Sequence, residues 1–193
     1  MPNWVTCKCM VSGPDAERKR FMDAGYFKKD KWGDGVMDFN MVIPEPNTQE
    51  ECPGQYVLCN DEERRISGML AGSGDDKPWF NWYRWRINNW GTKWTGEVVS
   101  WPKDEGEAVK FAINTAWSFP EGIAEKLTVL YPELEFSWEY ADEDVGQNCG
   151  FATGYRGTLA VMSREGDVKF ACGVLGYDYD EYMKEREDDD GNG

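Results

Sequence analysis

The order of strand-like and helix-like segments constrains the fold of this chain more than any other feature of its sequence. Outside a long polar stretch, the segments run in the order strand, helix, strand, strand, helix, strand. This order is typical of a ferredoxin-like α+β sandwich, in which helices cover one face of an antiparallel sheet. The segments are residues 3–12, 15–27, 36–43, 109–115, 121–131 and 134–140.

Turn and capping residues set the ends of these segments. Gly13 and Pro14 end the first strand, and Asp15 follows as the cap of the first helix. Pro120 opens the second helix and Pro132 ends it. Beyond the sandwich, additional strands are predicted at residues 150–153, 157–163 and 168–172, followed by a charged helix or frayed tail from residue 178.

This pattern predicts one core with an insertion and a tail. We expect residues 1–46 and 95–176 to form the ferredoxin-like α+β core. Residues 47–94 are predicted to be an inserted loop and helical segment, which turns polar after the second strand and ends in the stretch NWGTKW. Residues 177–193 are predicted to be an acidic tail.

Negative charge is concentrated in the C-terminal third of the chain. The whole sequence has a net charge of −15, from 36 acidic and 21 basic residues, with no histidine. Residues 133–193 hold 16 acidic and 5 basic residues, so 16 − 5 leaves a net charge of −11. Such a segment repels phosphates, which disfavours direct binding of DNA or RNA. These acidic residues either keep the protein in solution or imitate a polyanion for a partner that normally binds nucleic acid.

Several of these carboxylates are spaced to form a continuous surface. Glu133, Glu135 and Glu139 lie two or four residues apart, so on a strand they would line one face. Duplex DNA carries a phosphate every few ångströms, and a row of carboxylates could occupy a groove built for it. The predicted partner-binding surface consists of Glu133, Glu135, Glu139, Asp142, Glu143, Asp144, Asp178, Asp180 and Glu181.

Tryptophan is concentrated in a short stretch of the sequence. Seven of the ten tryptophans fall between Trp79 and Trp117, and those at 79, 82 and 85 recur at a spacing that favours a helix over residues 79–89. Our preferred interpretation is structural: NWGTKW forms a corner that pins the inserted helix to the sheet. The alternative is a ligand pocket, in which rings stack a ligand and Lys93 meets a phosphate. That pocket would consist of Asn89, Trp90, Thr92, Lys93, Trp94 and Trp117.

The residue types present exclude several kinds of active site. Without histidine there is no serine–histidine or cysteine–histidine arrangement, and no phosphate-binding glycine loop occurs. The six cysteines lack a CxxC pair, and Cys7 and Cys9 would share one face of the first strand as small buried residues. We therefore expect no catalytic residues, no metal and no cofactor. The remaining enzymatic alternative is a metal-assisted site that uses the carboxylates of residues 139–144.

Location is predicted from the absence of targeting signals. The segment MPNWVTCKC lacks a basic region followed by an apolar stretch, so no secretory signal is recognised. No apolar run reaches the ~18 residues that a membrane-spanning helix needs. We expect a cytoplasmic protein that does not associate with membranes.

Several stretches together resemble the YubB-like family of phage- and plasmid-borne proteins. The resemblance implies a ferredoxin-like domain and a mobile-element origin, and it implies no catalytic residues because the family has no agreed biochemical activity. The sequence departs from the family pattern in its acidic tail. The stretches are MPNW at 1–4, DFNMVIPEP at 38–46, NWGTKW at 89–94, TAWSFP at 115–120, YPELEF at 131–136 and YADEDVGQNCGF at 140–151.

Charge and resemblance together predict an accessory protein that acts by protein–protein binding. The expected target is a host nuclease or nucleic-acid-binding complex, such as CRISPR or restriction machinery, which the acidic surface would inhibit by imitating DNA. The family context alone suggests the anti-defence role. A small-ligand or nucleotide binder that uses Trp90 and Lys93 is the alternative. The oligomeric state is left open.

Overall fold

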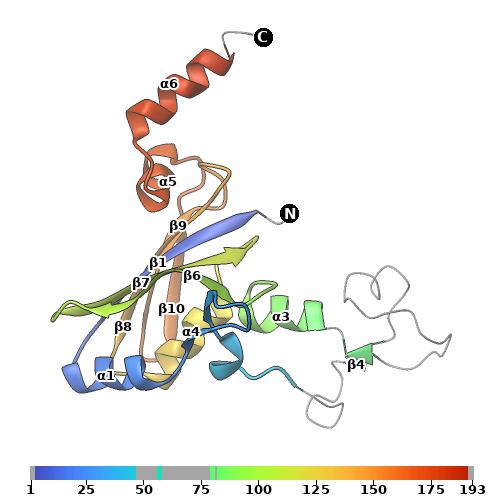
Figure 1. Cartoon of the computed structure of the whole chain (residues 1–193), viewed down its shortest axis with the longest axis vertical. Coiled ribbons are helices and arrows are strands. Elements are labelled where there is room, and N and C mark those ends of the chain that lie inside the picture. Colours follow the sequence, from blue (N-terminus) through green and yellow to red (C-terminus); the bar gives the residue numbers. More distant parts are fainter. Residues whose placement is uncertain (1–2, 47–55, 58–78, 81, 191–193) are drawn as a thin grey trace.

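One antiparallel sheet organises the described part of the chain, which comprises residues 3–46, 56–57, 79–80 and 82–190 of the computed structural model (Figure 1). Its eight strands are β1 (Trp4–Ser12), β2 (Phe27–Lys29), β3 (Gly35–Met37), β6 (Gly96–Asp104), β7 (Ala108–Ala116), β8 (Glu135–Asp142), β9 (Gly150–Tyr155) and β10 (Thr158–Ser163). Their order across the sheet is β10-β9-β8-β1-β7-β6-β3-β2. Two further short strands, β4 (Tyr56–Val57) and β5 (Trp79–Phe80), pair with each other.

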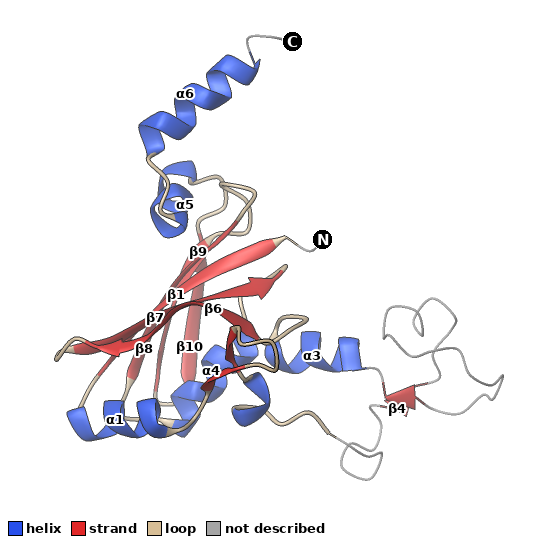
Figure 2. Ribbon diagram, in the orientation of Figure 1, coloured by secondary structure: helices blue, strands red, loops and turns tan. Residues whose placement is uncertain are grey.

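Helices are placed on one face of the sheet and beyond one of its ends. Figure 2 shows α1 and α4 side by side along one face, whereas α5 lies at the far end of the strands and α6 extends away from there. The helices are α1 (Asp15–Asp23), α3 (Trp82–Trp90), α4 (Glu121–Leu130), α5 (Val168–Leu175) and α6 (Tyr179–Asp190), with a 3-10 turn η1 at Phe39–Met41.

The predicted ferredoxin-like α+β fold is confirmed. The elements β1, α1, β6, β7, α4 and β8 follow one another as strand, helix, strand, strand, helix, strand. In space their strands take the order β8-β1-β7-β6, with every neighbouring pair antiparallel. The strands β2 and β3 extend this core at one edge, and β9 and β10 extend it at the other.

One member of the predicted pattern was assigned to the wrong segment. Residues 36–43 are not the second core strand: only Gly35–Met37 is extended, and the Asp38 side chain then accepts a hydrogen bond from the Asn40 N–H and starts the 3-10 turn. The second core strand is β6, which the sequence did not reveal. Its register against β7 shifts between Val98 and Ser100 and again before Lys103, so its side chains do not alternate regularly.

Two other boundaries were predicted wrongly for local reasons. Residues 168–172 were expected to be a strand but belong to α5, where the Asp167 carboxylate caps the helix by accepting from the Phe170 N–H. Gly176 ends α5 in the left-handed conformation, with φ of 81°. The first helix ends at Asp23 rather than at residue 27, because Gly25 also has a positive φ, of 78°.

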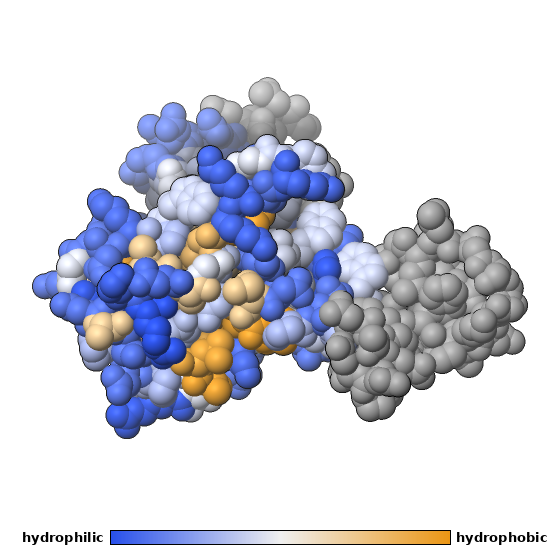
Figure 3. Space-filling model, turned by 60° about the horizontal axis from the view of Figure 1, so that its bottom comes forward, coloured by the Kyte–Doolittle hydropathy of each residue, from blue (hydrophilic) through white to orange (hydrophobic). Residues whose placement is uncertain are grey.

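Aromatic side chains fill the space between the sheet and the helices. Cys7 and Cys9 lie on the buried face of β1, as their spacing predicted. Phe21 of α1 is fully buried and packs its ring against those of Phe111 and Phe136 at centroid distances of 6.0 and 5.8 Å. With the bottom of the molecule turned forward, Figure 3 shows a mostly hydrophilic exterior around an apolar patch.

The opposite face of the sheet is covered only in part. Around β8 a second cluster of buried residues, which includes Ala141 and Cys149, packs against Ala171, Cys172 and Val174 of α5. The positions of β1 and β8 that face away from α1 and α4 are otherwise exposed or half-buried. The sheet thus has a buried helical face and an open face, and α5 closes one end of the open face.

Candidate functional site

The predicted acidic surface is divided by the fold into separate parts. Glu135 and Glu139 lie on the exposed side of β8, two positions to either side of Ser137. Glu133 is exposed in the turn before that strand. Glu143 and Asp144 are exposed in the loop that follows β8. The row predicted from residue spacing therefore exists on β8 itself for the two glutamates only.

Asp142 is separated from the other predicted carboxylates because it is buried, with 5% of its surface exposed. Its Oδ1 atom accepts hydrogen bonds from the Asn3 side chain at 3.2 Å and from the Asp144 N–H at 2.9 Å. The Asn148 side chain donates to Oδ2 at 3.5 Å. These donors tie the loop after β8 to the N-terminal strand, so Asp142 stabilises the loop and is not part of an accessible surface.

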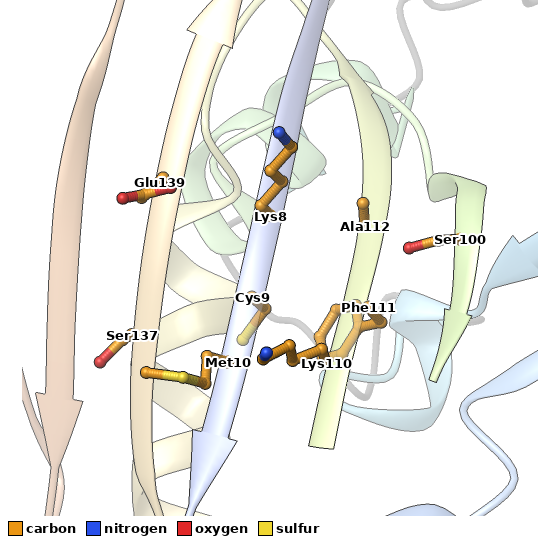
Figure 4. Close-up of a pocket in the computed structure, with 9 residues that line it drawn as sticks. All are labelled: Lys8, Cys9, Met10, Ser100, Lys110, Phe111, Ala112, Ser137 and Glu139. Atoms are coloured by element: carbon orange, nitrogen blue, oxygen red, sulfur yellow. The ribbon is translucent and has the colours of Figure 1, made fainter. Parts of the chain in front are cut away.

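The open face of the sheet mixes charges of both signs. Lys8 of β1 stands directly opposite Glu139 of β8, and its Nζ atom donates to the Gly173 carbonyl of α5 at 3.1 Å. Together with Lys110 of β7 and Met10 of β1, these side chains line a hollow of about 390 Å³. Figure 4 shows their placement on neighbouring strands. Because the lysines interrupt the carboxylates, this face does not resemble a polyanion.

The acidic character is strongest on α6. Asp178 caps this helix by accepting from the Glu181 N–H at 2.9 Å, and Asp180 and Glu181 are exposed in its first turn. Over Tyr179–Asp190 the sequence has seven acidic and two basic residues. Asp178, Asp180 and Glu181 of the predicted surface are thus gathered on one element that extends away from the sheet (Figure 2).

The tyrosines beside the acidic residues of α6 were not predicted as part of this surface. The rings of Tyr177 and Tyr182 are stacked, with centroids 6.4 Å apart and an interplanar angle of 14°. Tyr179 and Tyr182 also pack against the buried cluster beneath α5, which anchors the start of α6. An open depression of about 430 Å³ lies here, lined by Gly176, Tyr177, Asp178, Glu181, Tyr182 and Glu185. The spacing of three tyrosines around an acidic run was the available signal.

The stretch NWGTKW forms a corner whose polar groups find partners within the chain. Trp90 is fully buried, and its Nε1–H donates to the Ile43 carbonyl at 2.9 Å. The buried Thr92 hydroxyl donates to the Ala116 carbonyl of β7 at 2.7 Å. The Asn89 side chain donates to the Trp85 carbonyl within α3 at 2.8 Å. The bond from Thr92 ties the corner to the sheet, and the bond from Trp90 ties the end of α3 to the segment after η1.

Two glycines allow α3 and α4 to approach each other closely. Gly91 has a φ of 84°, and a Cβ atom there would lie 2.7 Å from the Glu121 N atom. A Cβ atom at Gly122 would collide with the Asn89 carbonyl. The role of Gly122 was not predictable from the sequence, because a glycine in a helix has no distinctive pattern.

Lys93 lies among the rings of the corner. Its Nζ atom is 4.5 Å from the ring centroid of Trp94 and 4.6 Å from that of Trp117. Trp117 itself has a φ of 69° and is 41% exposed. With Trp90 inaccessible and Lys93 held between rings, the geometry favours the structural interpretation of the corner over a stacking pocket.

The fold does not bring together the carboxylates that were considered for a metal-assisted site. Glu139, Asp142 and Asp144 face the open sheet, the interior and the solvent respectively, so the carboxylates of residues 139–144 do not converge. Within the described ranges, no group of three acidic or cysteine side chains could hold a metal ion. Burial raises the pKa of the Cys7 thiol to about 12, which keeps it protonated and unreactive. None of the described helices combines the length and apolar character needed to cross a bilayer.

Comparison with known protein families agrees with this fold. No curated protein matches the sequence significantly. A crystal structure of the protein Api92 from Yersinia pseudotuberculosis is similar with a TM-score of 0.43 and 11% identity, over 84% of this chain and 99% of that one. The family model described as "Ferredoxin-like domain in Api92-like protein" matches residues 89–189, from the NWGTKW corner through most of α6. The matched range thus includes most of the predicted acidic tail. The chain belongs to this family of Api92-like proteins with a ferredoxin-like domain.

Proposed function

We propose that this protein acts by protein–protein binding, and that the acidic helix α6 is its principal contact. The partner is a protein that normally binds nucleic acid, such as a host nuclease or a CRISPR or restriction complex, which α6 inhibits by occupying the site for the phosphate backbone. The resemblance to YubB-like proteins supports a phage or plasmid origin and hence an anti-defence role in the host cytoplasm.

The charge density of α6 carries this proposal. Twelve helical residues span about 18 Å, a length over which duplex DNA presents about ten phosphates. Over that length α6 offers seven carboxylates and two cations. The helix extends from the body, so a partner can reach it without rearranging the sheet (Figure 1). The open face of the sheet has no comparable density, because Lys8 and Lys110 lie among its glutamates.

The position of the charges along α6 also favours a cationic partner. Acidic residues in the first turn, Asp180 and Glu181, are stabilised by the positive end of the helix dipole. The last turn contains no basic residue to offset the negative end of the dipole. A protein that brings lysine or arginine side chains to this end would interact favourably with it.

Charge reversal combined with salt dependence tests the proposal. A tagged full-length chain is used to capture proteins from a bacterial lysate, with washes at low and high ionic strength. The variant Asp180→Lys/Glu181→Lys/Glu185→Lys changes the net charge by six and is expected to lose the captured protein. The matched control, Glu97→Lys/Glu107→Lys/Glu125→Lys, makes the same change at exposed positions of the body and is expected to retain it.

The captured protein should be a nucleic-acid-binding protein and should be released by high salt, since the contact is between exposed charges. Equal capture by the two triple variants, or capture that is insensitive to salt, would contradict the role of α6.

A further inference from the structure

The two edges of the main sheet differ in their protection against pairing with another strand. At one edge, β2 has three residues and exposes Lys28 and Lys29, and Lys28 pairs with Asp38 at 2.5 Å. At the other edge, β10 has six residues and the sequence TLAVMS, with no charge and no proline. Charged residues make up 30% of the whole chain, so an uncharged exposed strand is unusual for this protein. Short, lysine-bearing edges resist pairing, whereas long uncharged edges invite it.

The outward backbone groups of β10 can be identified from its pairing with β9. Arg164, next after the strand, donates its N–H to the Cys149 carbonyl and so points its backbone toward β9. Backbone direction alternates along a strand, so Met162 and Ala160 also point toward β9. Leu159, Val161 and Ser163 therefore point their N–H and C=O groups away from the sheet. In the described part of the chain these groups have no hydrogen-bond partner.

Apolar side chains flank this edge on both faces of the sheet. Val161 is 38% exposed and Met162 is 56% exposed on β10, and Tyr155 is 42% exposed on the neighbouring β9. Val129 of α4 is also exposed and approaches the turn between these strands, within 3.5 Å of where a Cβ atom of Gly157 would lie. An edge with unpaired backbone groups and apolar borders has the composition of an interface.

We propose that β10 is the interface of a homodimer, in which it pairs antiparallel with β10 of a second copy. Such a dimer must meet two conditions. Residues that face each other across the two-fold axis must have their side chains on the same face of the sheet, and the residues whose backbone N–H and C=O groups point away from β9 must form the hydrogen-bonded pairs. Both conditions are met with the axis at Val161, which then pairs with Val161 of the other copy. Leu159 pairs with Ser163, and Ala160 faces Met162, so no charged side chain opposes another. The sheets of the two copies become continuous.

The dimer has a salt dependence opposite to that of partner capture through α6. Each copy carries a net charge of −15, so association of two copies is opposed by long-range repulsion that salt screens. The dimer should therefore strengthen as ionic strength rises, whereas capture through α6 weakens. Failure of one prediction leaves the other intact.

Sedimentation equilibrium of the full chain over a range of concentrations tests the proposal. The mass is expected to rise from 22.1 kDa to twice that value as concentration increases. Val161→Lys places two like charges opposite each other at the axis and should weaken the dimer at least about tenfold. The matched control Val99→Lys, at a valine that is 55% exposed on β6, should leave the dimer unchanged.

A second variant and a second measurement protect the test against misfolding. Val161→Pro removes an outward N–H and no hydrogen bond to β9, so the fold should persist while dimerisation is lost. Hydrogen exchange should show amides of Leu159, Val161 and Ser163 that become protected as concentration rises, while that of Met162 is protected throughout. A mass of 22.1 kDa at every concentration, or a dimer insensitive to both Val161 variants, would overturn the proposal.

Discussion

The tryptophan corner and the acidic helix α6 are the two most distinctive stretches of this sequence, and the fold treats them in opposite ways. The corner turns inward: the Trp90 indole and the Thr92 hydroxyl each donate to a backbone carbonyl of another element. The helix α6 extends outward, and its carboxylates from Asp180 through Glu187 are exposed to solvent. A conspicuous residue that the chain satisfies by itself serves the structure, whereas charge presented outside the body is available to a partner.

The largest effect is expected from truncating the buried ring of the corner. Trp90→Ala should reduce the free energy of unfolding by about 3–5 kcal/mol, because it leaves a cavity where a fully buried ring packs against Phe39 and Trp85. Trp117→Ala is the matched control, since this ring is 41% exposed, and should cost about 1 kcal/mol. Urea unfolding of both variants measures the difference. Equal losses of stability in the two variants would contradict the claim that Trp90 is a buried packing residue and Trp117 is not.

A smaller effect is expected from removing one hydrogen bond of the corner. Thr92→Val keeps the side-chain shape but removes the donor to the Ala116 carbonyl, which should cost about 1–3 kcal/mol of unfolding free energy. Thr153→Val, at an exposed position of β9, should change it by less than about 0.5 kcal/mol. If the two valine variants were equally stable in urea, the bond from Thr92 would contribute nothing.

The buried thiol of Cys7 should make the stability of the protein depend on pH in the alkaline range. Burial raises the pKa of Cys7 from 9.0 to about 12, and its sulfur lies 3.6 Å from the Thr115 hydroxyl. Between these values the unfolded chain loses the thiol proton and the folded chain keeps it, so stability falls as pH rises above 9. The loss approaches about 1.4 kcal/mol per pH unit for this group. Unfolding measured against pH should show a shallower decline in Cys7→Ala; parallel curves would contradict the burial of the thiol.

The smallest effect on stability is expected from the charges of α6. Each of Asp180→Lys, Glu181→Lys and Glu185→Lys should change the free energy of unfolding by less than about 1 kcal/mol, because these side chains are exposed and the helix dipole acts only weakly on them. Combined in one variant, the three substitutions should abolish capture of the partner, which separates binding from folding. Thermal unfolding checks the first expectation. A cooperative loss of stability comparable to that of Trp90→Ala would show that α6 supports the fold instead.

The fold could be predicted from the sequence where local and tertiary signals agree. The regular alternation of β1 and the proline boundaries of α4 defined those elements within a residue or two. β6 was hidden because its register shifts break the alternation on which strand prediction depends. Residues 168–172 were misassigned because a short apolar run has no clear period. Across the whole of α5, Val168, Ala171, Cys172 and Leu175 do follow a helical repeat.

The candidate site was predictable in composition but not in arrangement. Residue spacing placed Glu135 and Glu139 on one face, and the fold agrees. It could not show that Lys8 would stand opposite Glu139, because that contact depends on the pairing of β1 with β8. Nor could it show that Asp142 would be buried beneath Asn3, 139 residues away in the sequence. Contacts between distant segments decide which carboxylates remain accessible.

Competition with nucleic acid tests the central claim most directly. Once a partner has been captured, its affinity for this chain is measured in the presence of increasing amounts of duplex DNA or RNA. If α6 occupies the groove for the phosphate backbone, the apparent dissociation constant rises in proportion to nucleic acid concentration and no ternary complex forms. An affinity unchanged by saturating nucleic acid, with all three components in one complex, would contradict the account.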